Sequence, residues 1–307
     1  MKKTVAISIG DLNGIGIQLA LENHEKVTTI INPLYCIDRI MLTQAAEKLN
    51  LSIPNDFNTI ENIAPTFTIE AGKVSKESGY YAYKSFNKAV DLADRKKVDA
   101  ICTLPIHKKA WELAEVKYKG HTDALRNFFD AQAIMMLGCP KMYVALFTEH
   151  IPLKEVAQNI EEKTLTRFFL DFYKTVKPTK KVAVLGLNPH AGDDGILGTE
   201  ELIIKKAIHN AHELLNTKIF TEPLVPDVAF TPNVRKEYCH YIAMYHDQGL
   251  APLKALYFDE GINVSLNLPI LRTSVDHGTA FDIAYKNKKL NSLSYLNAIQ
   301  YIADTKS

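Results

Sequence analysis

The sequence predicts an α/β protein built on a mainly parallel sheet. Short β-branched runs alternate with longer segments whose apolar residues recur at helical spacing, and this alternation continues through most of the 307 residues. An ordinary domain has about 100 to 200 residues, so the length predicts two domains or one large α/β unit. Hydrophobic residues make up 47% of the chain and charged residues 23%, which predicts a substantial core and excludes a disordered protein.

The expected strands are short and bounded by turns or helical segments. The first covers residues 4–9, an apolar run that ends at Gly10-Asp11. The others, in chain order, are residues 34–37, 98–103, 142–148, 181–186, 241–245 and 262–266. Helical spacing is clearest over residues 78–93, 164–173 and 199–215. No repeat, low-complexity tract or Gly/Ser linker interrupts this order, so we expect continuous structure between any two domains.

Charge and cysteine usage exclude several classes of protein. Lys plus Arg number 36 and Asp plus Glu 35, so the net charge of +1 gives no bulk attraction to nucleic acid or to an anionic membrane. The four cysteines have no paired spacing, which argues against disulfides and a Cys-type zinc site and favours the cytoplasm. The N-terminal apolar run is too short for a signal peptide, and no segment approaches the roughly 18 apolar residues of a membrane span.

The loop between the first strand and the next helix contains three glycines, Gly10, Gly14 and Gly16. Its backbone N–H groups could face an anion at the helix start, as in a dinucleotide-binding Rossmann domain. The comparison fails at Leu19, where close packing would require Gly or Ala. A tight strand-to-helix turn without ligand explains the loop equally well.

Three of the ten histidines lie just past a predicted strand: His150, His190 and His246. Because the carboxyl ends of parallel strands meet at one edge of a sheet, these imidazoles could converge on one divalent metal ion with an open coordination position. Asn188 and Asp247 are then candidate hydrogen-bond partners that fix the imidazole tautomers. Taken singly, each histidine is equally consistent with a hydrogen-bonded side chain in a cleft.

A second group of polar residues suits a phosphorylated substrate. Lys254, Asn263 and Arg272 supply two cations and an amide close to the last predicted strand. Upstream, His121 and Thr122 belong to a compact polar segment with little reason to lie in a core. The alternatives are a solvated surface lysine for Lys254 and a structural ion pair for Arg272.

Several of these segments carry a family resemblance. They are, in chain order, Gly10-Asp11, Gly120-His121-Thr122-Asp123, His150-Ile151-Pro152-Leu153, Asn188-Pro189-His190-Ala191-Gly192, Tyr245-His246-Asp247-Gln248-Gly249 and Ser274-Val275-Asp276-His277-Gly278-Thr279-Ala280. Together they resemble the 4-hydroxythreonine-4-phosphate dehydrogenase family of vitamin B6 biosynthesis over nearly the whole chain. The last segment is also similar to the His-Gly-Ser/Thr-Ala loop with which isocitrate and isopropylmalate dehydrogenases bind the adenosine end of their dinucleotide.

The resemblance implies a set of site residues. The metal ligands would be His150, His190 and His246, for one zinc, magnesium or cobalt ion per subunit. The substrate-binding residues would be His121, Thr122, Lys254, Asn263 and Arg272, and the dinucleotide, NAD or NADP, would contact His277, Gly278, Thr279 and Ala280. The sites would be shared across a homodimer interface.

The resemblance also implies an architecture: two α/β domains of the isocitrate and isopropylmalate dehydrogenase type, with a cleft between them. We expect the first domain to comprise residues 1–120 and 272–307, with the cofactor loop, and the second to comprise residues 121–271, with metal, substrate and dimer contacts. In place of two prolines and a glutamate of the family's first loop, this chain has Leu12, Ile17 and Gln18. Losing the prolines removes local stiffness, so any cofactor role of this loop is in doubt.

The implied reaction oxidises 4-phosphooxy-L-threonine with NAD and then releases carbon dioxide, giving 3-amino-2-oxopropyl phosphate and NADH. A metal ion would polarise the substrate hydroxyl. Lys254 and Asp247 are the candidate catalytic residues, although a nearby histidine could also transfer the proton. The alternatives are a dehydrogenase of the same fold for 4-phospho-D-threonate or D-erythronate, and a non-catalytic phospho-ligand sensor or metal-free acyltransferase.

Overall fold

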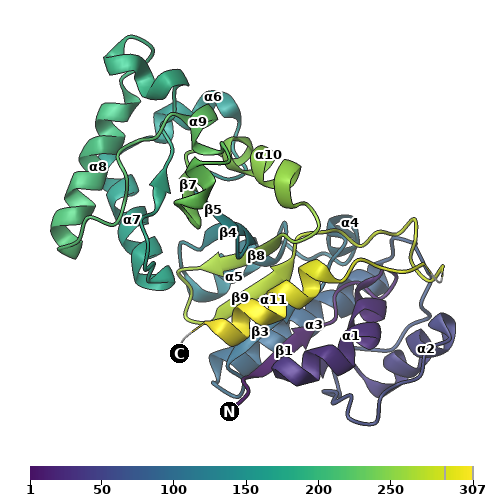
Figure 1. Cartoon of the computed structure of the whole chain (residues 1–307). Coiled ribbons are helices and arrows are strands. Elements are labelled where there is room, and N and C mark those ends of the chain that lie inside the picture. Colours follow the sequence, from purple (N-terminus) through teal and green to yellow (C-terminus); the bar gives the residue numbers. More distant parts are fainter. Residues whose placement is uncertain (287, 306–307) are drawn as a thin grey trace. The chain divides into compact units, whose positions relative to one another are not determined.

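The computed structural model describes residues 1–286 and 288–305 and divides the chain into two compact units. Unit 1 comprises Met1–Ala131 and Ile262–Ser307, and unit 2 comprises Gln132–Gly261. Figure 1 labels their elements along the chain. The first boundary between the units follows residue 131, whereas the sequence predicts it after residue 120. The second boundary precedes residue 262, whereas the sequence predicts it before residue 272. The helix α5 (His121–Phe129) and the strand β8 (Ile262–Leu266) therefore belong to unit 1.

The strands of unit 1 are ordered β2-β1-β3-β9-β8. Their bounds are Asn32–Cys36, Thr4–Ser8, Ala100–Thr103, Leu271–Val275 and Ile262–Leu266. All neighbours are parallel except β8, which runs antiparallel to β9. The central strands are buried on both faces, which is why they contain short continuous runs of apolar residues.

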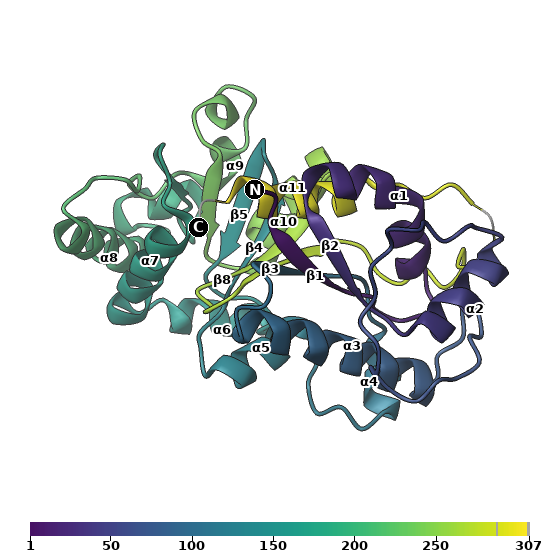
Figure 2. The same cartoon turned by 90° about the horizontal axis from the view of Figure 1, so that it is seen from below.

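Helices cover both faces of this sheet (Figure 2). On one side α1 (Gly16–Ile30) packs against α11 (Leu293–Asp304), and on the other lie α3 (Lys76–Asp94), α4 (Lys108–Leu113) and α5. The remaining helix, α2 (Arg39–Leu49), contacts α1. The helix α3 begins after Ser75, whose hydroxyl accepts a hydrogen bond from the Ser78 N–H and so satisfies one unpaired donor of the first turn.

Unit 2 contains the strands β4, β5, β7 and β6, which lie side by side in that order. Their bounds are Ile134–Cys139, Met142–Leu146, His240–Ala243 and Ala183–Val184. The β4–β5 pair is an antiparallel hairpin and the other pairs are parallel. Around them lie α6 (Leu153–Val156), α7 (Glu162–Val176), α8 (Glu200–Leu215), α9 (Pro226–Ala229), α10 (His246–Tyr257) and the 3-10 turns η1 (Ala157–Asn159), η2 (Pro189–Gly195) and η3 (Val234–Lys236).

The α/β class and the mainly parallel pairing predicted from the sequence are confirmed. Each of the seven expected strands is present, although residues 181–186 form only the two-residue strand β6. Two strands were not expected. The strand β4 is rich in Met, and β9 contains Arg272, Thr273 and Ser274, whose polar side chains hide the strand pattern. In the described parts of the chain, no helix combines the length and apolar character that a membrane span requires.

The closest helix contact in unit 1 depends on Gly79. A Cβ atom at this position of α3 would overlap the backbone carbonyl of Ala110 in α4. In an open helix, Gly→Ala stabilises by up to about 1 kcal/mol. Overpacking against a backbone group that cannot rotate away costs about 1–3 kcal/mol, so we expect Gly79→Ala to lower the thermal midpoint by several degrees. The matched control is Gly120→Ala, where no atom lies within 4 Å of the added Cβ. An equal loss in both variants would contradict this packing.

Candidate active site

Arg272 lies in the middle of the unit 1 sheet and is 2% exposed. The strand register pairs it with Ile101 of β3 on one side and with Ser265 of β8 on the other. Because side chains alternate along a strand, Thr103 points to the same face as Ile101, next to the guanidinium. The sheet pairing therefore determines which groups surround Arg272.

The hydrogen-bond partners of Arg272 are all neutral. Nε and Nη2 donate to Thr103 Oγ1 at 3.2 and 2.7 Å, and Nη1 donates to Ser265 Oγ at 3.1 Å. Nη2 also lies 3.2 Å from His121 Nδ1. No carboxylate among the described residues pairs with it. Burial lowers the pKa of Arg272 to about 10, so the group remains a cation at neutral pH.

A buried cation without an anionic partner is costly in a protein interior. Arg272 uses four of its five N–H groups on neutral partners and has one N–H of Nη1 left. This arrangement suits an anionic ligand, which would supply the missing counter-charge.

His121 carries a second N–H donor without a partner. Arginine can only donate, so His121 Nδ1 accepts the bond from Arg272 and Nε2 carries the hydrogen. Nε2 is buried and has no hydrogen-bond partner among the described residues. Burial, and then the charge of Arg272, lowers the pKa of His121 well below its ordinary value, so the ring is neutral. The ring packs against Phe86 and against the edge of Trp111, with ring centroids 4.7 and 5.4 Å apart.

Of the other residues predicted to bind phosphate, Thr122 and Asn263 belong to unit 1 and Lys254 belongs to unit 2. Thr122 follows His121 in the first turn of α5, where backbone N–H groups favour anions. Asn263 of β8 has a buried side-chain oxygen without a partner among the described residues. Lys254 belongs to α10 of unit 2, and its Nζ lies 5.7 Å from the centre of the Phe258 ring. Sequence reasoning missed Thr103 and Ser265, although Thr103 does end a predicted strand.

The three candidate metal ligands belong to unit 2. The rings of His150 and His246 lie 5.5 Å apart, whereas His190 lies in the turn η2. Within the described residues of one chain, no three His, Cys, Asp or Glu side chains form a metal-binding group. His246 Nδ1 lies 2.7 Å from Asp247 Oδ1, which places the hydrogen on Nδ1 and leaves the lone pair on Nε2.

The predicted cofactor segment packs against the first loop. The Ile15 N–H donates to the Thr279 carbonyl at 3.1 Å, and Tyr285 Oη donates to the Leu12 carbonyl at 2.7 Å. His277 Nδ1 lies 3.1 Å from the Gly278 carbonyl, while its Nε2 is buried and has no partner in the described residues. A Cβ at Gly278 would meet no atom within 4 Å, so space lies open beside this segment.

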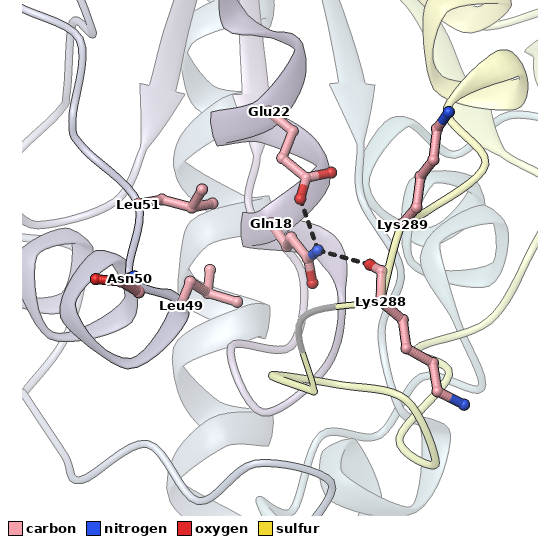
Figure 3. A pocket seen from close by; sticks show the side chains of 7 residues that line it. All are labelled: Gln18, Glu22, Leu49, Asn50, Leu51, Lys288 and Lys289. Atoms are coloured by element: carbon pink, nitrogen blue, oxygen red, sulfur yellow. Dashed lines mark hydrogen bonds between the residues drawn. The ribbon is translucent and has the colours of Figure 1, made fainter.

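The divergent residues of the first loop are structural. Leu12 and Ile17 are fully buried, so core packing replaces the stiffness of the prolines. Gln18 Nε2 donates to Glu22 Oε1 at 2.7 Å and to the Lys288 carbonyl at 3.1 Å. Gln18, Glu22 and Lys288 line a cavity of about 440 Å³ together with Leu49, Asn50, Leu51 and Lys289 (Figure 3). The cavity contains none of the predicted site residues.

Comparison with known proteins identifies the family. Residues 29–302 match the family model described as pyridoxal phosphate biosynthetic protein PdxA. A 4-hydroxythreonine-4-phosphate dehydrogenase of Sulfurimonas denitrificans is 60% identical over 299 residues, which cover 97% of this chain and 96% of that protein. The chain therefore belongs to the PdxA family, as the sequence motifs predicted.

Solved structures agree with this assignment. A crystal structure of a 4-hydroxythreonine-4-phosphate dehydrogenase from Burkholderia phymatum aligns with a TM-score of 0.83 at 31% identity, covering 99% of this chain and 98% of that chain. A terephthalate 1,2-cis-dihydrodiol dehydrogenase from Burkholderia xenovorans aligns with a TM-score of 0.70 at 22% identity, covering 98% and 97%, and shares the fold. The predicted dehydrogenase fold is thus confirmed.

The buried carboxyl of Asp11 in the first loop should make stability depend on pH. Burial raises its pKa from 3.8 to about 6, against the hydrogen bonds from the Asn13 N–H and the Ser78 hydroxyl. The folded state then binds the proton more tightly than the unfolded state, so this contribution to stability falls as the pH rises from about 4 to above 6. Asp11→Asn removes the ionisation and keeps the acceptor for Asn13.

We expect the free energy of unfolding of Asp11→Asn, relative to wild type, to rise by about 2 kcal/mol between pH 4.5 and pH 7. Urea unfolding at both pH values measures it, and the comparison cancels groups that titrate alike in both proteins. A difference between variant and wild type that does not change with pH would contradict the raised pKa.

Thr103 should matter for anion binding because its oxygen accepts two bonds from Arg272. Thr103→Val keeps the shape but removes the acceptor, and we expect it to weaken the binding of inorganic phosphate about tenfold, since bonds to a charged group contribute about 1.5–3 kcal/mol. Thr103→Ser keeps the hydroxyl and is the matched control. Titration calorimetry measures both, and equal affinity of wild type and Thr103→Val would refute the role of Thr103.

Proposed function

We propose that this protein oxidises and decarboxylates 4-phosphooxy-L-threonine (4-hydroxythreonine-4-phosphate), with NAD or NADP as hydride acceptor. The products are 3-amino-2-oxopropyl phosphate, carbon dioxide and the reduced dinucleotide. The observation that carries the proposal is the buried pair of Arg272 and His121, which offers a cation and a neutral N–H donor to an anion. Membership of the PdxA family and the 60% identity to a 4-hydroxythreonine-4-phosphate dehydrogenase support the same substrate.

The phosphate group of the substrate fits this pair. Arg272 supplies the charge and one remaining N–H, and His121 supplies Nε2–H. The first turn of α5 adds Thr122 and backbone donors. Lys254 and Asn263 complete the proposed set. A phosphate held here would fix the orientation of the substrate, so that its hydroxyl and carboxylate are presented in one way only.

We propose the histidines of unit 2 as the ligands of a divalent metal ion, on the chemistry of their side chains. Three imidazoles are suitable donors for zinc or cobalt, and magnesium would rely more on substrate oxygens and water. Asp247 holds the hydrogen on His246 Nδ1 and so keeps the other nitrogen available. When bound, the ion supplies Lewis-acid polarisation of the substrate hydroxyl. The ligands proposed are His150, His190 and His246.

We propose that a homodimer completes this metal site. His150 and His190 are exposed. The described residues of a single chain form no metal-binding group of three His, Cys, Asp or Glu side chains. Large apolar side chains are exposed near them in the sequence, with Leu153 at 69% and Ile196 at 80%. Burial of such side chains against a partner would be favourable, by about 1.5–3 kcal/mol for each one fully covered. A second copy of unit 2 would cover them.

The dinucleotide would bind at the segment that contains His277, Gly278, Thr279 and Ala280. Support comes from the open space beside Gly278 and the unpaired nitrogen of His277. For proton transfer we propose Lys254, with Asp247 acting through the tautomer of His246.

The proposal is tested with purified, metal-loaded protein and 4-phosphooxy-L-threonine, by following the absorbance of the reduced dinucleotide. We expect turnover with this substrate, loss of activity after chelation and recovery with added zinc, magnesium or cobalt. Unphosphorylated 4-hydroxythreonine is the matched substrate, and its KM should be at least about 100-fold higher because Arg272 lacks its counter-charge.

Two results would contradict the proposal. Rapid turnover of 4-phospho-D-threonate or D-erythronate without turnover of the threonine phosphate would assign the chain to the sugar-acid reaction. Absence of reduced dinucleotide with every substrate and either dinucleotide would leave a phosphate-binding protein without dehydrogenase activity.

A further inference from the structure

The turn η2, which carries His190, has an unusual backbone. His190, Ala191, Gly192, Asp193 and Asp194 all have positive φ, between 45° and 82°. Four of these five residues have side chains, for which the left-handed conformation is unfavourable, so a run of this length requires support from its surroundings. The contacts that stabilise this backbone conformation therefore determine the position of His190.

The strongest support comes from Glu201, the second residue of α8. Its side chain is buried, with the residue 4% exposed. Oε1 accepts hydrogen bonds from the backbone N–H groups of Leu187 and Asn188 at 2.9 and 2.7 Å, and Oε2 accepts one from Asn188 Nδ2 at 3.0 Å. These three bonds fix Leu187 and Asn188, directly before the turn, and His190 follows Asn188 by two residues.

Glycines allow this carboxylate to approach the turn closely. A Cβ at Gly192 would lie 2.6 Å from Glu201 Oε2, and a Cβ at Gly186 would lie 3.0 Å from the Ala191 Cβ. The turn is therefore folded directly over the buried carboxylate.

Gln248 links this turn to the segment of His246. Its Nε2 donates to the Gly186 carbonyl at 2.6 Å, and its Oε1 accepts from the Met244 N–H at 2.7 Å. Gly186 directly precedes the residues that Glu201 holds, and Met244 lies two residues before His246. Side chains of two helices thus hold the backbone of two candidate metal ligands.

We infer that Glu201 is a positioning residue for the metal site: its carboxylate holds the left-handed turn so that His190 can serve as a ligand. The inference rests on the proposed metal site. Glu201 has no direct contact with the metal in this account, since its oxygens are already used by N–H groups. Partners of this kind, one step removed from the metal, commonly change metal affinity when they are replaced.

The test uses Glu201→Gln in the full chain. The amide can keep the bonds from Leu187 and Asn188 N–H through its oxygen, but its NH₂ group then faces the NH₂ group of Asn188. We expect Co²⁺ to bind about 10- to 100-fold more weakly than to wild type. Titration of metal-free protein, followed by the visible absorption of Co²⁺, measures the affinity without any assay of activity.

The matched control is Glu200→Gln. Glu200 also accepts a bond from Asn188 Nδ2, at 2.8 Å, but it is less buried than Glu201 and holds no backbone N–H before the turn. We expect its Co²⁺ affinity to stay within about threefold of wild type. Phosphate affinity should be unchanged in both variants, because neither replaces a residue of the proposed phosphate set and its buried members Arg272 and His121 lie in unit 1. A general loss of structure would lower phosphate affinity too.

His190→Ala distinguishes the proposed metal site from the positioning role of Glu201. If Glu201 acts through His190, the double variant His190→Ala/Glu201→Gln binds Co²⁺ no more weakly than His190→Ala alone. Wild-type affinity in Glu201→Gln, together with a loss in His190→Ala, would overturn the inference and leave the metal site standing. Wild-type affinity in His190→Ala would overturn the proposed metal site and the inference with it.

Asn188→Ala provides a milder variant should Glu201→Gln fail to fold. It removes the side-chain bonds to Glu200 and Glu201 and keeps both backbone bonds to Glu201. Weaker Co²⁺ binding with unchanged phosphate affinity supports the inference, and unchanged Co²⁺ binding overturns the part of it that assigns the bond from the Asn188 side chain a role.

Discussion

The guanidinium of Arg272 is buried in the centre of unit 1, and the surrounding residues are arranged to hold it there without neutralising it. Its partners are two hydroxyl groups and an imidazole nitrogen. They accept bonds from four of its five N–H groups but leave its charge uncompensated, which a protein interior tolerates only at a cost in stability. The pairing of β9 with β3 and β8 places these partners, and α5 brings His121 to the same face. The folded unit thus retains a buried cation, and we propose the substrate phosphate as its counter-ion.

The buried acidic side chain of unit 2, Glu201, has a different environment from Arg272. The carboxylate of Glu201 is surrounded by three N–H donors and needs no ligand. It serves to hold a backbone that would otherwise be unfavourable, in the turn that carries His190. The two buried charges therefore differ: Arg272 has no anionic partner among the described residues, whereas three N–H donors of the protein itself surround the Glu201 carboxylate. This difference follows from hydrogen-bond geometry and not from the amount of burial.

Much of the architecture could be predicted from the sequence, because buried parallel strands appear as short apolar runs. The strand β9 could not, since its polar residues Arg272, Thr273 and Ser274 interrupt that pattern. Family motifs indicated Arg272 and His121 separately, yet their contact joins positions 151 residues apart, which no local pattern reports. The left-handed turn was also unpredictable, because four of its residues are not glycine and the contacts that support it, including those of Glu201, come from residues later in the chain.

Thermal unfolding of Arg272→Met, with and without inorganic phosphate, tests the central claim most directly. Methionine fills a similar volume without charge, and replacing buried charged groups by well-packed apolar side chains is often neutral or stabilising. The account predicts that the variant unfolds at an equal or higher temperature than wild type without phosphate, and that phosphate raises the midpoint of wild type only. A variant that is clearly less stable without phosphate, or that phosphate stabilises as much as wild type, would contradict it.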